Sequence, residues 1–250
     1  MTAPSLRWLA YARWLLLDYL WQRLLLPLVL AALLVTGMLY SVSGQSSKPG
    51  FWTSPDGVRF ALIVLRQVMG TFLPLAVLMA MNGVVAQDRQ KGYFRFLFSK
   101  PVPVTGFYVS AFVVHLVAAA AAAGLLAAAL GAFSAPQQVV GVALACALTF
   151  VLLGSLLFLF SVLTYQDGIV FILLWVATLL ARQLEPALRP GHWMHSAVRV
   201  LPPTHRLDAV REALYTAQPV PMNDLWHVLA YGGACFALAV VALRKLPLAR

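Results

Sequence analysis

The sequence predicts an all-α membrane protein, a bundle of about six transmembrane helices in one domain that covers residues 1–250. Of the 250 residues, 62% are hydrophobic and only 10% are charged, whereas a soluble domain carries about 25% charged residues. The apolar residues form long continuous runs, each close to the roughly 20 residues that a helix needs to cross a bilayer. A membrane β-barrel would instead show short alternating segments.

Six apolar runs are the expected spans, at about 24–42, 60–86, 104–131, 138–164, 169–184 and 226–243. Pro74 is expected to kink the second span because proline removes a helix hydrogen bond. The third span contains the run from Ala118 to Ala123, and small residues let membrane helices pack closely. Residues 5–22 combine tryptophan, leucine and arginine, which predicts an interfacial helix before the first span.

The chain has a net charge of +10, and its basic residues lie largely at the ends of apolar runs. This distribution therefore indicates membrane topology and lipid headgroup contacts rather than nucleic-acid binding. Basic residues precede the first span, follow the second and form the tail after the sixth. The positive-inside rule then predicts that both termini are cytoplasmic. The expected location is the inner membrane of a bacterium. The segment 185–225 is external in this topology despite its own arginines, and re-entry of part of it into the membrane is the alternative.

One polar island, residues 87–103, separates the second span from the third. It is polar, then amphipathic, and proline ends it, which predicts a short helix at the cytoplasmic face. The charged side of such a helix can contact a soluble partner. Its aromatic side, which includes Phe94, can anchor between the spans.

This island resembles the coupling helix in the permease subunits of type-2 ATP-binding-cassette exporters. The residues that match are Asp88, Arg89, Gly92, Leu97 and Pro101. In that family the coupling helix docks in a groove of the ATPase subunit, and the resemblance implies this role for these residues and for Phe94. Three positions depart from the family pattern, namely Gln90 for a second acid, Tyr93 for a threonine and Ala111 for a lysine.

A second stretch, residues 201–214, resembles the external segment of the same family: proline, a small polar residue and a helix that bears an arginine. Thr204 is expected to cap that helix. An interfacial helix that merely covers the end of the bundle is the alternative for this stretch.

The resemblance implies the membrane subunit of an exporter that moves its cargo by alternating access. The sequence contains no Gly-x-x-x-x-Gly-Lys-Ser/Thr phosphate loop. ATP and magnesium would then bind to a separate ATPase subunit, and this chain would be neither an enzyme nor the holder of a cofactor. A second permease copy or a paralogue would complete the pathway. The cargo, and the choice between homodimer and heterodimer, stay open.

Several single residues are candidates for more specific roles. Arg59 and Arg66 share a helical face near the outer end of the second span. They are candidates for contacts with cargo or lipid headgroups, with snorkelling to the interface as the alternative. The histidines of the external segment do not form a complete ligand set, so no metal is expected; they are His192, His195 and His205.

The remaining polar and sulfur-bearing residues within spans have simpler interpretations. The two cysteines, Cys146 and Cys235, are expected to be small buried hydrophobic residues. The isolated polar side chains are expected to form hydrogen bonds between helices; they are Gln67, Asn82 and His115.

Three other functional classes compete with the exporter. An intramembrane enzyme would need paired acids, a Ser-His pair or metal ligands, but the eight acidic residues are scattered. An ion-coupled carrier or channel usually has a carboxylate in mid-span, and here Asp167 lies in a turn. A scaffold subunit that binds an ATPase without moving cargo is the third class.

Overall fold

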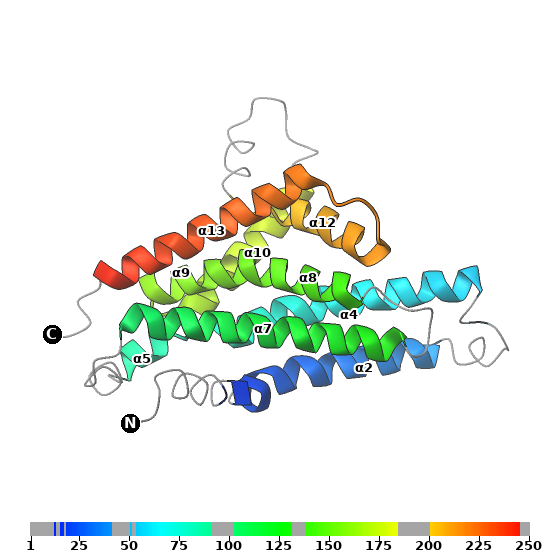
Figure 1. The fold of residues 1–250 in the computed structure, drawn as a ribbon, viewed down its shortest axis with the longest axis horizontal. Helices are drawn as coiled ribbons and strands as arrows, with labels where there is room; N and C mark the ends of the chain where they lie inside the picture. The colour runs from blue at the N-terminus through cyan, green and yellow to red at the C-terminus, as the bar shows by residue number, and fades with distance from the viewer. Residues whose placement is uncertain are drawn as a thin grey trace, which may run out of the picture.

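The computed structural model describes residues 13, 16–17, 19–41, 51, 54–91, 103–131, 139–184 and 201–245. Within these ranges every extended regular element is a helix. Most of the helices run along one long axis (Figure 1). The predicted all-α class is therefore confirmed.

In the described part of the first half, a π-helical turn, η1 (Tyr19–Leu24), is followed by four helices. They are α2 (Leu25–Ser41), α4 (Pro55–Met81), α5 (Ala86–Gln90) and α7 (Val104–Gly131). In the second half, α8 (Val139–Thr149), the π-helical turn η3 (Phe150–Gly154) and α9 (Ser155–Leu163) follow one another without a break. Then come α10 (Asp167–Leu184), α12 (Thr204–Thr216) and α13 (Met222–Lys245).

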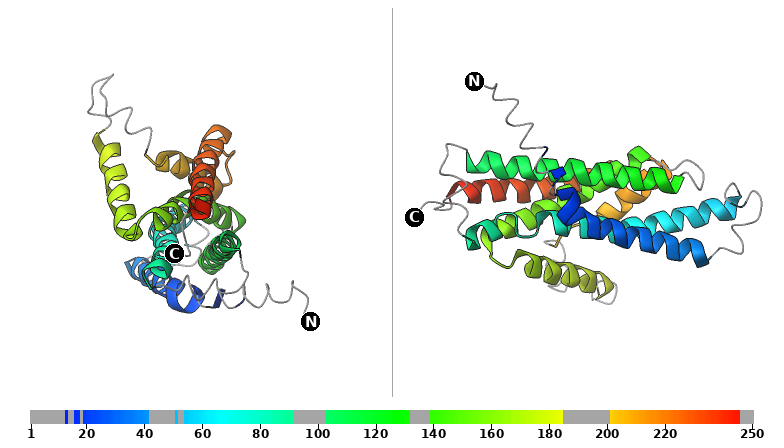
Figure 2. Two further views of the ribbon diagram at one scale, coloured as in Figure 1. Left: turned by 90° about the vertical axis from the view of Figure 1, so that its left-hand side faces the viewer. Right: turned by 90° about the horizontal axis from the view of Figure 1, so that it is seen from below.

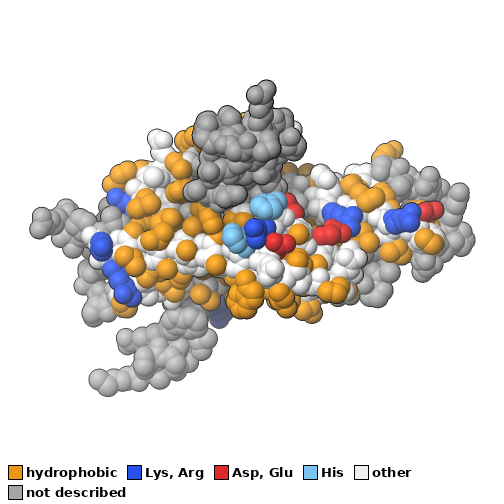
Figure 3. Space-filling model, turned by 90° about the horizontal axis from the view of Figure 1, so that it is seen from above, with side chains coloured by type: hydrophobic (Ala, Val, Ile, Leu, Met, Phe, Trp, Pro, Cys, Tyr) orange, Lys and Arg blue, Asp and Glu red, His pale blue; other side chains and the backbone are white. Residues whose placement is uncertain are grey.

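Among the described residues, four helical runs are long and apolar enough to cross a membrane: 55–90 (α4 together with α5), 104–129, 139–163 and 222–245. The apolar parts of α2 and α10 are shorter. Apolar side chains cover much of the face drawn in Figure 3, and many large apolar side chains of the described residues are exposed. The chain is thus a helical membrane protein by length and composition. The count of six spans stays a prediction, as does the interfacial helix at 5–22, which lies largely outside the described residues.

The predicted second span, 60–86, lies within the run 55–90, but its ends differ from those of α4. Helix α4 begins at Pro55, and Ser54 caps it by accepting a hydrogen bond from the Gly57 N–H at 3.2 Å. The helix continues through Pro74 and stops at Met81, five residues before the predicted end. A turn over residues 82–85 then leads into α5.

Close packing in the bundle depends on small residues and on aromatic side chains. On α7, Ala119 and Ala123 are fully buried, and a Cβ at Gly124 would lie 3.6 Å from the side chain of Ala143 on α8. The prediction that the alanine run allows close packing is therefore confirmed. The predicted burial of the cysteines is confirmed as well.

Helix α13 touches the middle of the bundle through its backbone. A Cβ at Gly232 would lie 2.6 Å from the carbonyl oxygen of Val151 in η3, whereas one at Gly233 would meet nothing within 4 Å. Beside this contact, the ring of Phe112 packs against the rings of Phe150 and Phe236, with centroids 5.3 and 4.8 Å apart. Side chains from α7, η3 and α13 thus form one aromatic cluster.

Helices α10 and α12 differ from the rest in how they contact the bundle. Helix α10 stands away from the other helices along most of its length (Figure 2), and its main contact is with α9. Helix α12 packs against the sides of α8 and α13. It therefore does not simply cover the end of the bundle.

The expected capping role of Thr204 is wrong. Pro203 is the N-cap residue of α12, and Thr204 is the first residue inside the helix, with no capping hydrogen bond from a side chain. The Pro203 carbonyl already accepts from the N–H groups of Arg206 and Leu207, both at 3.1 Å. The helical geometry therefore starts one residue earlier than the sequence suggested.

Candidate functional site

The turn between α4 and α5, together with α5 itself (residues 82–90, the α4–α5 junction), is where distant parts of the chain meet. The helical backbone is interrupted at Gly83, whose φ is +72°. This left-handed conformation favours glycine because a Cβ would clash with the backbone. The Asn82 N–H still bonds to the Leu78 carbonyl at 2.8 Å, so α4 ends in an ordered cap.

Three backbone N–H groups of this junction donate hydrogen bonds to side chains of α9 and α10 and not to carbonyls of their own helix. The Gly83 N–H donates to Asp167 Oδ2 at 2.7 Å, and the N–H groups of Val85 and Ala86 donate to Ser161 Oγ at 3.0 and 3.1 Å. The first N–H groups of a helix lack partners within it. Both side chains are buried, so they satisfy donors that would otherwise be costly to bury.

Asp167 has both of its carboxylate oxygens engaged. Oδ2 accepts from Gly83, and Oδ1 accepts from the Gly168 N–H at 3.0 Å, at the start of α10. A Cβ at Gly168 would lie 2.7 Å from the side-chain oxygen of Asn82. The corner between α9 and α10 therefore fits closely against the end of α4, and this carboxylate holds two backbone segments together.

Arg89 and Gln90 attach α5 to the same corner. The Arg89 guanidinium donates to the Val162 carbonyl at 2.7 Å and to the Tyr165 hydroxyl at 3.1 Å, and it lies 4.6 Å from the centre of the Tyr165 ring. The Gln90 amide donates to the Tyr165 carbonyl at 3.0 Å. Carbonyls in the last turn of a helix have no intrahelical partner, and Arg89 supplies one to α9.

Helix α7 and the π-helical turn η1 form further hydrogen bonds at the junction and at the end of α4. The Tyr108 hydroxyl on α7 donates to Asp88 Oδ2 at 2.8 Å. The Arg23 guanidinium of η1 donates to the Ala80 carbonyl near the end of α4, also at 2.8 Å. The α4–α5 junction is thus bonded to α7 and to the α9–α10 corner, and the end of α4 just before it is bonded to η1.

The predicted coupling residues divide into two groups. Asp88 and Arg89 are described, and both side chains bond to other helices of the same chain. The other four lie outside the described residues; they are Gly92, Phe94, Leu97 and Pro101. Contact of this segment with an ATPase stays a prediction, while the hydrogen bonds show that Asp88 and Arg89 position α5.

Sequence reasoning missed the residues that hold the junction. Ser161 was not singled out, Tyr108 was passed over within the third span, and Asp167 was interpreted only as a turn residue. One signal was present: Gly83 stands directly after an asparagine near the end of an apolar run, a pattern that marks a turn or helix end.

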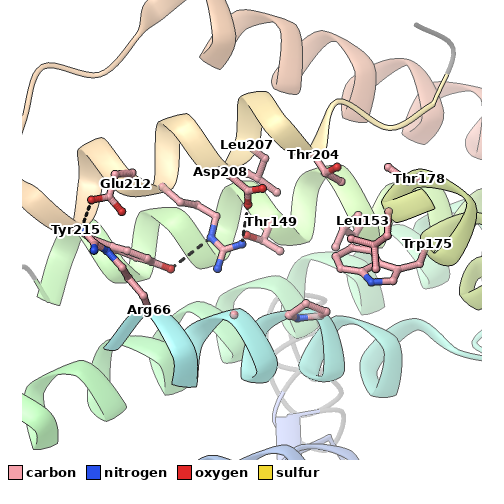
Figure 4. Close-up of a pocket in the computed structure, with 14 residues that line it drawn as sticks. Arg66, Thr149, Leu153, Trp175, Thr178, Thr204, Leu207, Asp208, Glu212 and Tyr215 are labelled. Carbon is pink, nitrogen blue, oxygen red and sulfur yellow. Dashed lines mark hydrogen bonds and ion pairs between the residues drawn. The ribbon is translucent and has the colours of Figure 1, made fainter. Parts of the chain in front are cut away.

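The two arginines predicted to contact cargo or headgroups are both exposed on α4. Arg66 forms an ion pair with Glu212 of α12 (Figure 4), a partner that the sequence did not predict. Arg59 lies two turns earlier in α4. Their predicted ligands stay untested, but Arg66 faces another helix of the chain as well as the surface.

Other predicted polar residues have mixed outcomes. His115 is buried against the Tyr19 ring, with ring centroids 4.7 Å apart, and its Nδ1 has no hydrogen-bond partner among the described residues. His192 and His195 lie outside the described ranges. In the part of the chain that the structure describes, no three His, Cys, Asp or Glu side chains are grouped as metal ligands would be.

Comparisons of the chain with protein-family models, with curated proteins and with solved structures found no match. The functional interpretation therefore depends on the residues themselves: the pattern over 88–101, the helical membrane architecture and the contacts of the α4–α5 junction.

Proposed function

We propose that this chain is the membrane subunit of an ATP-binding-cassette exporter. A separate ATPase subunit would bind ATP and magnesium and dock on the segment 87–103. A second copy of the chain, or a paralogue, would complete the pathway in a bacterial inner membrane, with both termini cytoplasmic. This proposal extends the resemblance carried by Asp88, Arg89, Gly92, Leu97 and Pro101.

The observation that supports it most is the set of hydrogen bonds around α5. A coupling helix must pass a displacement to the membrane helices, so it has to be attached to them firmly. Arg89 bonds to two groups of the α9–α10 corner, and Asp88 bonds to α7. A force on α5 would therefore reach several membrane helices at once.

The same geometry weighs against an ion-coupled carrier that uses Asp167. This carboxylate is buried, but both of its oxygens accept backbone hydrogen bonds. Such a carboxylate stabilises the fold. It is a poor site for an exchangeable ion, because breaking its two hydrogen bonds would leave buried N–H groups unpaired. An intramembrane enzyme and a scaffold subunit remain competing classes. Partner analysis separates the enzyme from the exporter, and the coupling experiment separates the scaffold, which binds an ATPase as well.

The first experiment is purification of the tagged full-length chain from its own membranes in a mild detergent, followed by mass spectrometry. The exporter predicts a stoichiometric partner that carries a phosphate loop. A folded chain that repeatedly purifies without such a partner would contradict the proposal and favour a carrier, a channel or an enzyme.

A second experiment tests coupling without knowledge of the cargo. Binding of ATP to the complex should change deuterium exchange in α10, and Arg89→Gln should abolish that change while the ATPase still hydrolyses ATP. Arg244→Gln is the matched control, because Arg244 is an exposed arginine in the last turn of α13. Equal behaviour of the two variants would show that Arg89 has no part in coupling.

A further inference from the structure

Helices α4, α8, α10 and α12, with η3, line a partly open pocket of about 320 Å³ (Figure 4). Small-molecule sites in proteins usually have volumes of about 300–1,000 Å³, so the cavity is large enough for one small ligand or headgroup. Its lining includes Arg66, Gly70 and Pro74 of α4 and Thr204 of α12.

Two polar groups of the lining lack their usual partners. Thr204 is 7% exposed, and its hydroxyl oxygen has no hydrogen-bond partner among the described residues. The Gly70 carbonyl cannot receive the normal helix hydrogen bond, because the residue four positions later is Pro74, which has no N–H. The space beside Gly70 is open, since a Cβ there would meet nothing within 4 Å. Buried polar groups normally have partners, so the Thr204 hydroxyl indicates a bound polar molecule, and the exposed Gly70 carbonyl offers such a molecule an acceptor.

Two more hydroxyls present only acceptor sites to the pocket. Thr149 donates its proton to the Ala145 carbonyl, and Thr178 donates its proton to the Leu174 carbonyl, both at 2.7 Å. A hydroxyl has one proton and two lone pairs. These two hydroxyl oxygens can therefore only accept hydrogen bonds from a ligand, so the ligand must bring donors of its own.

The charges of the lining are already paired. Arg66 bonds to Glu212, and Arg211 bonds to Asp208 at 3.4 Å. Arg211 also donates to the Tyr215 hydroxyl at 3.3 Å, and burial raises the pKa of that tyrosine, so it stays neutral. An anionic or a cationic ligand would have to compete with a charge that is already present in each pair, whereas an uncharged ligand would leave both pairs undisturbed.

The rest of the wall is apolar. Leu153, Trp175 and Leu179 line it from η3 and α10, and Trp175 stands across the cavity from α12 (Figure 4). An indole and two leucines favour a ligand with an apolar face or chain.

We propose that this pocket binds an uncharged amphipathic molecule that carries hydroxyl groups on an apolar body, as an alkyl glycoside does. Its hydroxyls would donate to the Gly70 carbonyl and to the threonine oxygens, and its apolar part would pack against Trp175. The proposal depends on the pocket alone. It holds whether or not an ATPase subunit binds this chain.

The test is protection of a thiol placed in the pocket. Thr204→Cys is made in a Cys146→Ala/Cys235→Ala background, and the full chain in lipid nanodiscs is treated with N-ethylmaleimide. Three probes with the same tail are compared below their micellar concentrations: octyl β-D-glucoside, octyl phosphate and octylamine. Ala209→Cys is the matched control, because it lies exposed on the same helix and outside the lining.

The glucoside should slow the reaction of the T204C variant by about tenfold at about ten times its dissociation constant, as simple mass action requires. The A209C variant should be unaffected. Stronger protection by octyl phosphate or octylamine would overturn the uncharged ligand class, and a reactive T204C variant that no probe protects would overturn the site.

A second variant tests the charge argument. Glu212→Gln removes the partner of Arg66, so octyl phosphate should protect the T204C thiol only when this substitution is added. If octyl phosphate protects equally with Glu212 present, the ion pair does not exclude anions and the reasoning fails.

Should Thr204→Cys prevent folding, thermal unfolding replaces the thiol assay. Octyl β-D-glucoside should stabilise the unmodified chain but not the Gly70→Leu variant, whose added side chain enters open space and fills the cavity. Equal stabilisation of both chains would refute binding in this pocket.

Discussion

Replacement of Ser161 by alanine is the sharpest test of the α4–α5 junction. The Ser161 side chain is fully buried, and its oxygen accepts hydrogen bonds from the N–H groups of Val85 and Ala86 at 3.0 and 3.1 Å. In the Ser161→Ala variant both donors lose this acceptor, and these groups begin a helix and have no partner within it. The substitution removes only one oxygen, so packing changes little.

The size of the effect follows from those two donors. Each buried N–H that loses its partner costs about 1–3 kcal/mol, and partial relaxation or entry of water reduces the sum to about 2–4 kcal/mol. That corresponds to an increase of about 30-fold to 700-fold in the population of the locally opened junction. The rest of the bundle does not share these hydrogen bonds and should be almost unaffected.

The assay is hydrogen–deuterium exchange of the peptide that covers residues 82–90, with the chain in lipid nanodiscs. Thr36→Ala is the control, because the Thr36 hydroxyl is exposed and bonds only to the Ala32 carbonyl of its own helix, at 2.8 Å. That control should change local stability by no more than about 0.5 kcal/mol. If exchange over 82–90 is the same in both variants, Ser161 does not hold the junction and the coupling argument loses its main support.

The other predictions concern stability and use thermal unfolding as the measurement. Gly83→Ala should destabilise the chain by about 1–2 kcal/mol because of its positive φ, whereas Gly37→Ala, in open space within α2, should have no unfavourable effect. Gly232→Ala should cost about 1–3 kcal/mol through its clash with the backbone of η3, and Gly233→Ala, one residue away, should not. Glu212→Gln should change stability by less than about 1 kcal/mol, because its ion pair is nearly half exposed. A destabilised G233A variant or a stable G232A variant would show that the α13 contact is described wrongly.

The helices of this chain could be predicted from the sequence because their signal is local. The predicted spans 104–131 and 138–164 agree with α7 and with the run from α8 to α9 to within one residue at each end. Length and apolar composition decide such segments in a membrane. The alanine run and the two cysteines were predicted correctly for the same reason.

The contacts that define the candidate sites could not be predicted in this way. Asp167 lies 84 residues from Gly83, and Glu212 lies 146 residues from Arg66. Helical periodicity shows which face a residue occupies, but it does not show which distant segment that face meets. The apolar run did not have to continue as one helix past Met81, because the N–H groups of Gly83, Val85 and Ala86 have partners on other helices.

The α4–α5 junction and the pocket are connected by the two helices that they share. Helix α10 begins at the junction, where Asp167 binds Gly83, and farther along it contributes Trp175 and Thr178 to the pocket. Helix α4 contributes Gly70 and Pro74 to the pocket and ends at the junction. A displacement of α5 that moves α10 relative to α4 would therefore change the shape of the pocket. Linkage then requires the reverse effect, so a ligand that prefers one pocket shape would shift the position of α5 by the same free energy.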